Sequence, residues 1–131
     1  MGYIIDTDVC IDFLKNREFA VELFEKISEK DQYFISILTY YELLKASYSK
    51  KQYKSVEVFA SSIEILNLDR KIIKMGAEFY INYRKRGITL CDIDCLIMAT
   101  AKENNLKIIT RNVRHYPERN LLSDFSLRMR K

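Results

Sequence analysis

Three carboxylate residues stand beside apolar segments at widely separated points of the chain. Asp6 follows the apolar run 3–5, Glu42 lies in a segment of helical spacing, and Asp94 lies near the start of another such segment. Clustered carboxylates repel each other unless a cation neutralises them. A fold that brings the three together would therefore form a divalent-metal site. Because the chain contains one histidine, oxygen ligands and Mg²⁺ or Mn²⁺ are expected.

Each acidic residue also has a structural explanation that the sequence leaves open. Asp6 is typical of a turn or a helix N-cap. Glu42 follows Thr39 by three residues, which is the spacing of a capping box. Asp92 and Asp94 both suit the first turn of a helix, where carboxylates complement the helix dipole, and one of them could be the N-cap. Chemistry is favoured because several such residues fall where a single α/β fold would gather them.

The elements that must position these residues alternate along the chain. Short apolar runs predict strands at 3–5, 33–36, 64–68 and 107–110. Apolar residues at helical spacing predict helices through 14, and at 18–29, 37–49, 51–62, 70–86 and 93–101. The segment 111–119 is expected to be irregular, and a last short strand is expected near Phe125.

Strands that alternate with helices predict an α/β fold with a mostly parallel sheet covered on both faces. Ligands bind to such sheets outside the carboxyl ends of the strands, and Asp6 and the segment 110–112 follow strands at that edge. At the helix ends, Thr7 or Asp8 is expected to cap the first helix. Asp69 is expected to cap the helix 70–86, and Gly87 to end it.

The composition is that of one globular domain covering 1–131, with 48% apolar and 31% charged residues. The N-terminal apolar stretch stops too early for a signal peptide, and no run is long enough to cross a bilayer, so a cytoplasmic protein is expected. Cys10, Cys91 and Cys95 lack paired spacing and are expected to be reduced, buried small hydrophobes. A zinc site formed by these thiols and His115 is the disfavoured alternative.

The net charge of +4 is too small an excess to indicate a nucleic-acid partner by itself. Its distribution is more informative, because the lysines of segment 45–54 have no acidic residue among them and tyrosines are interleaved with them. Solvated helix faces are the alternative explanation for any one basic group. The candidate nucleic-acid contacts are Lys45, Lys50, Lys51, Arg111, Arg114 and His115.

Four segments together resemble the PIN-domain ribonucleases, particularly the VapC-type toxins of prokaryotic toxin–antitoxin pairs. They extend over nearly the whole chain in the family's order and spacing, and the ordered set is more specific than any one motif. The segments are Ile4-Ile5-Asp6-Thr7-Asp8-Val9, Ile35-Ser36 through Thr39 to Glu42-Leu43, Asp94-Cys95-Leu96-Ile97-Met98-Ala99, and Ile108-Ile109-Thr110-Arg111-Asn112.

The resemblance implies a PIN-like three-layer sandwich in which Asp6, Glu42 and Asp94 bind Mg²⁺ or Mn²⁺. Asn112 falls at the family's fourth position, where Asp or Asn is seen, although by itself it could be only a turn residue. The resemblance further implies hydrolysis of RNA phosphodiesters to 5′-phosphate and 3′-hydroxyl ends, a homodimer, and a VapB-type antitoxin that covers the site.

Two residues depart from the family's pattern. Asp8 stands where Asn is usual and adds a negative charge beside the site, and Met98 replaces a customary small residue. Asp8, Asp92 and Thr110 are expected to be auxiliary residues of the site, and the sequence leaves open whether Asp92 or Asn112 completes it.

Two other function classes remain open. Asp6-Thr7-Asp8 after a strand also resembles the haloacid-dehalogenase phosphatases, although these usually have Thr or Val at the position of Cys10 and generally need a longer chain. A non-catalytic PIN-like module that binds RNA or protein is the second alternative. The three carboxylates argue against it, because an idle acidic cluster destabilises the fold.

Overall fold

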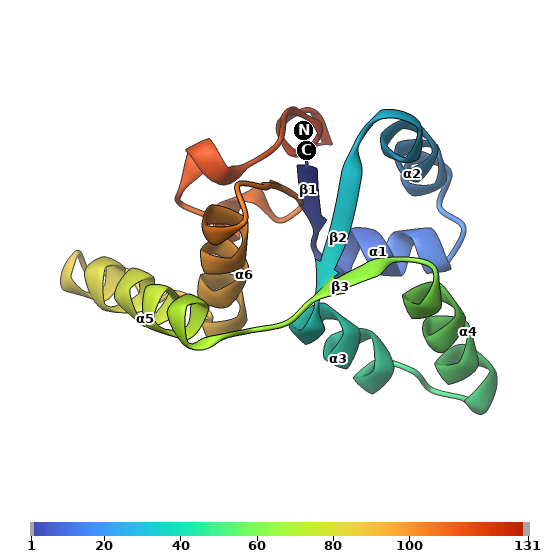
Figure 1. The fold of residues 1–131 in the computed structure, drawn as a ribbon, viewed down its shortest axis with the longest axis horizontal. Helices are drawn as coiled ribbons and strands as arrows, with labels where there is room; N and C mark the ends of the chain where they lie inside the picture. The colour runs from blue at the N-terminus through green and yellow to red at the C-terminus, as the bar shows by residue number, and fades with distance from the viewer. Residues whose placement is uncertain (1, 130–131) are drawn as a thin grey trace.

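A four-stranded parallel sheet lies between two groups of helices in the computed structural model, which describes residues 2–129 (Figure 1). Its spatial order is β3-β2-β1-β4, and every neighbouring pair is parallel. The predicted α/β sandwich is therefore confirmed. The strands are β1 (Gly2–Ile5), β2 (Gln32–Ser36), β3 (Glu64–Leu66) and β4 (Lys107–Ile109).

Helices cover both faces of the sheet (Figure 1). One side carries α1 (Thr7–Leu14), α2 (Glu18–Lys30), α3 (Ile37–Lys45) and α4 (Lys50–Ser61), and the other carries α5 (Arg70–Lys85) and α6 (Asp92–Glu103). After β4 come two short 3₁₀ turns, η1 (Val113–His115) and η2 (Arg119–Leu121), and the helix α7 (Asp124–Met129). No helix between residues 2 and 129 combines the length and apolar character needed to span a membrane.

The two hydrophobic cores follow from the alternation of side chains along β1 and β4. Ile4 and Ile108 belong to the core under α6, while their neighbours Ile5 and Ile109 belong to the core under α1 to α4. All four side chains are 0% exposed. Burial on both faces explains why these strands are short, continuous apolar runs and do not alternate with polar residues.

The ends of α5 match the sequence prediction. Asp69 caps the helix by accepting a hydrogen bond from the Ile72 N–H at 2.8 Å. Past the last turn, Gly87 has a φ of +82° and the Ile88 N–H donates to the Tyr83 carbonyl, which is the Schellman arrangement. Glycine reaches this left-handed conformation without strain, so Gly87 ends the helix.

The strand expected near Phe125 is wrong, because this segment is the helix α7. Ser123 Oγ accepts a hydrogen bond from the Ser126 N–H at 3.1 Å and so caps the helix start. Pairing with the sheet is limited to a single parallel bridge between Leu122 and Ile108. The local capping signal of Ser123 therefore ends the strand-like pairing before Phe125.

Two helix starts also differ from expectation. The N-cap of α1 is Asp6, not Thr7 or Asp8. The N-cap of α3 is Ser36, whose hydroxyl accepts from the Leu38 N–H at 3.0 Å. Thr39 is consequently a buried residue inside α3, so the capping box that its spacing to Glu42 suggested does not form.

The thiols are only partly as expected. Cys10 and Cys95 are buried free cysteines, as predicted, but Cys91 is exposed. Cys91 is the N-cap residue of α6 and lies outside the apolar stripe of that helix, which explains its exposure.

Candidate active site

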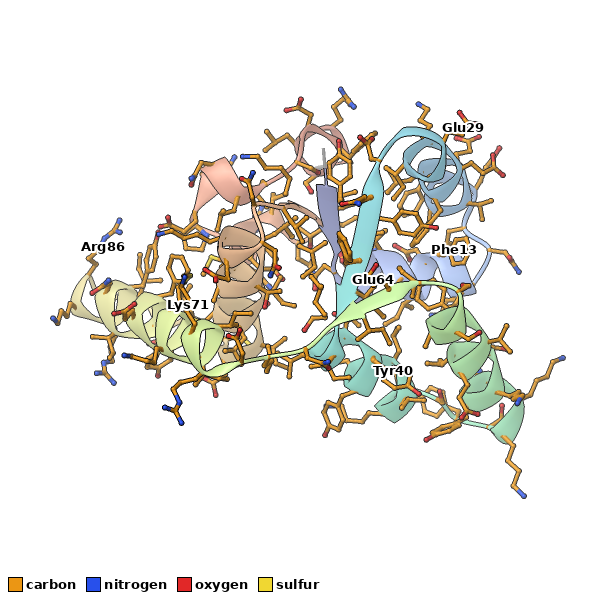
Figure 2. The ribbon with its side chains drawn as sticks, viewed as in Figure 1. Phe13, Glu29, Tyr40, Glu64, Lys71 and Arg86 are labelled. Atoms are coloured by element: carbon orange, nitrogen blue, oxygen red, sulfur yellow. The ribbon has the colours of Figure 1, made fainter. Side chains whose placement is uncertain are left out.

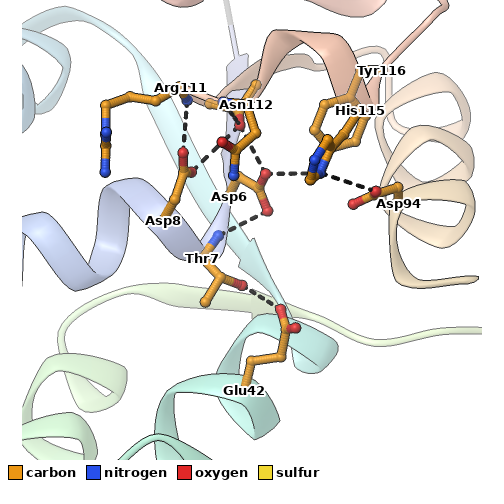
Figure 3. A network of polar contacts seen from close by, with 10 residues as sticks. Asp6, Thr7, Asp8, Glu42, Asp94, Arg111, Asn112, His115 and Tyr116 are labelled. Atoms are coloured by element: carbon orange, nitrogen blue, oxygen red, sulfur yellow. Dashed lines mark hydrogen bonds and ion pairs between the residues drawn. The ribbon is translucent and has the colours of Figure 1, made fainter. Parts of the chain in front are cut away.

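The carboxylates lie where β1, β2 and β4 end at the carboxyl edge of the sheet (Figure 3). Asp6 directly follows β1, and its N–H donates to the Ile109 carbonyl at 2.9 Å, which continues the pairing with β4. Glu42 projects from α3, the helix that follows β2, and Asp94 lies in the first turn of α6. Parallel strands with short connections thus bring residues from three parts of the chain to one edge.

Asp6 is the buried centre of this site, with 8% of its surface exposed. Its Oδ1 accepts a hydrogen bond from the Thr7 N–H at 2.8 Å. Its Oδ2 accepts from two hydroxyls, those of Thr110 at 2.9 Å and Tyr116 at 2.8 Å. Burial raises the pKa of Asp6, and the nearby Asp94 charge adds to the rise, while the three hydrogen bonds oppose it.

Asp8 lies in the first turn of α1, beside Asp6. Its Oδ2 accepts from the backbone N–H of Arg111 at 2.9 Å, and burial and the Asp6 charge raise its pKa. The Arg111 side chain, however, is directed to Asp12: Nε donates to Asp12 Oδ2 at 2.7 Å, and the guanidinium lies 5.8 Å from the centre of the Phe19 ring. Arg111 therefore anchors the loop after β4 to α1.

Glu42 and Asp94 border Asp6 from the other two helices. Glu42 Oε1 accepts a hydrogen bond from the Thr7 hydroxyl at 2.5 Å. Asp94 Oδ2 lies 3.5 Å from Nδ1 of His115, a side chain that is 58% exposed. Burial raises the pKa of Asp94, helped by the charges of Glu42 and Asp8 and opposed by that of His115.

The structure thus brings Asp6, Asp8, Glu42 and Asp94 into electrostatic contact. Two expected members of the site stand further out. Asp92 is exposed in the first turn of α6. Asn112 is also exposed, and its backbone N–H donates to the Thr110 hydroxyl at 3.0 Å.

The donor set suits a hard divalent cation, although it is not a closed cage. As the side chains stand, no three Asp, Glu, His or Cys residues in the described part of the chain are placed to hold one metal ion directly. Mg²⁺ keeps several waters and uses only one or two carboxylates, so a direct three-carboxylate cage is not required. The hydrogen-bond donors to Asp6 are neutral, which leaves its charge without a cation among those contacts.

The candidate nucleic-acid contacts are on the surface. Lys45 is exposed at the end of α3 with Nζ 5.2 Å from the centre of the Tyr41 ring. Lys50 and Lys51 are exposed in the first turn of α4, and Arg114 is exposed in η1. Their role remains a prediction.

Thr7, Asp12 and Tyr116 belong to the network but were not predicted as members of the site. Thr7, whose hydroxyl binds Glu42, was expected only as a helix cap. Asp12 lies four residues after Asp8, and two acids at that spacing on a helix repel each other unless a cation lies beside them. Arg111 supplies it. No sequence pattern indicated Tyr116, because it lies in the irregular segment 111–119, whose path is set by tertiary contacts.

This sheet order and this edge of carboxylates define a PIN-type fold, and a PIN-domain family model matches residues 3–117. The chain belongs to the PIN-domain family. Within it, the chain is similar to the VapC proteins: Ribonuclease VapC1 of Methanocaldococcus jannaschii is 31% identical over 126 residues, which cover 96% of this chain and 85% of that protein.

Solved structures agree on the fold. The crystal structure of VapBC2 from Rickettsia felis, bound to a DNA fragment from their promoter, matches with a TM-score of 0.79 and 21% identity over 93% of this chain and 96% of the other. A toxin–antitoxin complex from Klebsiella pneumoniae matches with a TM-score of 0.78 and 24% identity, covering 92% and 95%. The family favours the PIN interpretation over the phosphatase alternative.

Proposed function

We propose that this protein is a Mg²⁺- or Mn²⁺-dependent endoribonuclease and the toxin of a VapBC-type toxin–antitoxin pair. The observation that carries the proposal is the gathering of Asp6, Glu42 and Asp94 at the carboxyl edge of the sheet, where the pKa values of Asp6 and Asp94 are raised by burial and by neighbouring carboxylates. The similarity to a protein named as a VapC ribonuclease supports RNA as the substrate.

The residues that would hold the ion are Asp6, Glu42 and Asp94. When bound, Mg²⁺ or Mn²⁺ supplies the charge that neutralises a phosphodiester and makes water nucleophilic at neutral pH. The chain's own residues fix the carboxylates: the Thr7 hydroxyl holds Glu42. His115, exposed beside Asp94, lies at the rim, where it is suited to contact a substrate phosphate.

Asn112 is the proposed fourth position, acting through water, since its side chain is exposed next to the Thr110 that binds Asp6. Asp8 and Thr110 are proposed auxiliaries: Asp8 adds charge beside Asp6, and Thr110 binds it. Asp92 is the weaker candidate because it is exposed outside the network.

A VapB-type antitoxin is the proposed partner, and the fold shared with the Klebsiella pneumoniae toxin–antitoxin complex supports it. We further propose that residues 1–131 act as a single PIN-like domain, as a homodimer, in the cytoplasm. The match of the family model over residues 3–117 supports the single domain.

RNA cleavage by the purified protein tests the proposal. Labelled cellular RNA is incubated with protein in Mg²⁺ or in EDTA, and the new 5′ ends are mapped by sequencing, both in vitro and after induction in cells. We expect Mg²⁺-dependent cuts that carry 5′-phosphates and that disappear with Asp6→Asn but persist with Glu57→Gln, a charge change at an exposed position of α4. Cleavage that continues in EDTA would contradict the proposal, and so would an absence of cleavage in both Mg²⁺ and Mn²⁺.

A further inference from the structure

Tyr116 contacts the acidic site from inside the protein. The residue follows η1 and is 0% exposed, yet its hydroxyl donates to Asp6 Oδ2 at 2.8 Å (Figure 3). The charge of Asp94 also acts on this phenol. The phenol donor thus lies between the carboxylate that follows β1 and a carboxylate of α6. Because it is fully buried, it cannot contact an RNA substrate.

The hydrogen bonds to Asp6 are distributed unequally over its two oxygens. Oδ2 accepts from both Tyr116 and Thr110, whereas Oδ1 accepts only from the Thr7 N–H. Each carboxylate oxygen offers about two lone pairs, so Oδ2 is saturated and Oδ1 keeps one lone pair. The carboxylate is thereby fixed in rotation by donors on both oxygens.

The phenol is held in this position by the packing around its ring. Tyr116 is 0% exposed and belongs to the core under α6, so its hydroxyl has no solvent contact that would compete with Asp6. The interaction is therefore a fixed feature of the acidic edge.

We propose that Tyr116 is a positioning residue that, together with Thr110, saturates Oδ2 of Asp6 and leaves Oδ1 as the oxygen that binds the divalent cation. This inference rests on the proposed function. Partners that orient a metal ligand in this way contribute about 10- to 100-fold to metal affinity or activity. Tyr116 would act through Asp6 alone, without touching the substrate.

The chain contains a matched control for the test. Tyr83 is also a buried phenol, 5% exposed, and it also donates to a carboxylate, that of Glu118. This second pair joins α5 to the segment before η2, and its hydrogen bond involves none of the three carboxylates of the site. Tyr116→Phe and Tyr83→Phe each remove one hydroxyl and keep the ring, so they carry the same chemical change at two places.

The experiment measures Mn²⁺ binding by electron paramagnetic resonance without RNA, and then kcat and KM for RNA cleavage. We expect Tyr116→Phe to weaken Mn²⁺ binding about 10-fold and to lower kcat with KM for RNA nearly unchanged, while Tyr83→Phe leaves both as in the wild type. Equal Mn²⁺ affinity of Tyr116→Phe and wild type would overturn the positioning role alone. A wild-type protein that binds no Mn²⁺ and cuts no RNA would overturn the proposed function as well.

A second variant covers the case in which Tyr116→Phe does not fold, as judged by circular dichroism. Thr110→Val removes the other donor to Oδ2, and Thr110→Ser keeps it. Weaker Mn²⁺ binding with Val but not with Ser would support the saturation of Oδ2. Equal binding by the two would overturn it.

Discussion

The hydroxyl of Thr7 donates a hydrogen bond to Oε1 of Glu42, 35 residues later in the chain, at a distance of 2.5 Å. Thr7 is the first residue of α1 and Glu42 lies on α3, so this bond joins the residue after Asp6 to the carboxylate of another helix. The buried Thr39 hydroxyl lies 3.3 Å from that of Thr7 and lines the same contact.

Thr7→Val removes this donor and keeps the branched shape of the side chain. We expect RNA cleavage to fall about 10-fold, because Glu42 loses the partner that orients it. Thr7→Ser retains the hydroxyl and should keep most of the activity. Initial rates on one labelled RNA measure the difference, and similar rates for Val and Ser would show that the bond has no role.

Neutral variants of the three carboxylates test the site as a unit. Asp6→Asn, Glu42→Gln and Asp94→Asn should each lower the cleavage rate by roughly two to three orders of magnitude, the cost typical of losing one group that stabilises transition-state charge. Far-ultraviolet circular dichroism should be unchanged, and Glu57→Gln should behave as wild type. If two of the three variants remain active, the assignment of the site fails.

The strands and the acidic positions were predictable because their signals are local. A buried parallel strand needs a short apolar run, and Asp6 ends such a run at the edge where ligands bind. Glu42 and Asp94 were placed correctly on helices near this edge, since α3 follows β2 and α6 precedes β4. The helix end at Gly87 was equally local, as the chemistry of a left-handed residue requires.

Other features depended on competition or on tertiary contacts. Ser36 caps α3 in place of Thr39 because it is the last residue of β2, and α3 follows β2 directly (Figure 1). Its hydroxyl is therefore available at the helix start, where it accepts from the Leu38 N–H. Tyr116 reaches Asp6 only through the folded path of 111–119, which has no periodic pattern. The direct approach of three carboxylates to one ion depends on side-chain rotamers, and sequence spacing cannot supply these.

Lower pH in the absence of metal, and bound metal at neutral pH, should each stabilise the folded protein. The folded-state pKa values of Asp6, Asp8 and Asp94 are raised above the ordinary value of 3.8, so their contribution to stability is complete below that value and is lost as pH rises through the folded pKa. In EDTA, these three groups should therefore favour the folded state more as the pH falls from neutral toward 3.8, which raises the melting temperature. At pH 7, Mg²⁺ at 100 times its Kd should raise the free energy of unfolding by about 2.7 kcal/mol, and so raise the melting temperature.

Differential scanning fluorimetry across pH, with and without Mg²⁺, measures this linkage. Asp8→Asn should weaken the pH dependence in EDTA, because it removes one of the three carboxylates. A melting temperature that changes with neither Mg²⁺ nor pH would show that the carboxylates do not interact as described.

Asp12 and Asp8 lie one turn apart on α1, and neutralising each should change the stability of the metal-free protein in opposite directions. Asp12→Asn removes the anion that binds the partly exposed Arg111 side chain, with Nε 2.7 Å from Oδ2, and should destabilise the metal-free protein by up to about 1 kcal/mol. Asp8→Asn relieves repulsion with Asp6, while its side-chain oxygen can still accept from the Arg111 N–H. Chemical denaturation of both variants in EDTA separates the effects, and destabilisation of equal size would contradict the distinction.

The lysines at the start of α4 give a surface prediction. Lys50, Lys51 and Lys54 are exposed residues of α4. Figure 2 shows side chains with nitrogen ends that project outward from this helix. If they neutralise phosphates of single-stranded RNA, replacing each such lysine should reduce the slope of log affinity against log salt by about 0.7. The triple change to Gln should therefore flatten the slope by up to about 2 and weaken binding of all RNA sequences alike.

Binding is measured with Asp6→Asn protein, so that the RNA stays intact, by fluorescence anisotropy at several salt concentrations. Lys71→Gln is the matched control, because Lys71 is an exposed lysine of α5 whose Nζ pairs with Glu103 at 3.1 Å. This change should leave the slope as it is in the parent protein. An unchanged slope in the triple variant would show that the lysines of α4 do not bind RNA. Arg114 and His115 would then be the candidate contacts to test, since His115 borders Asp94.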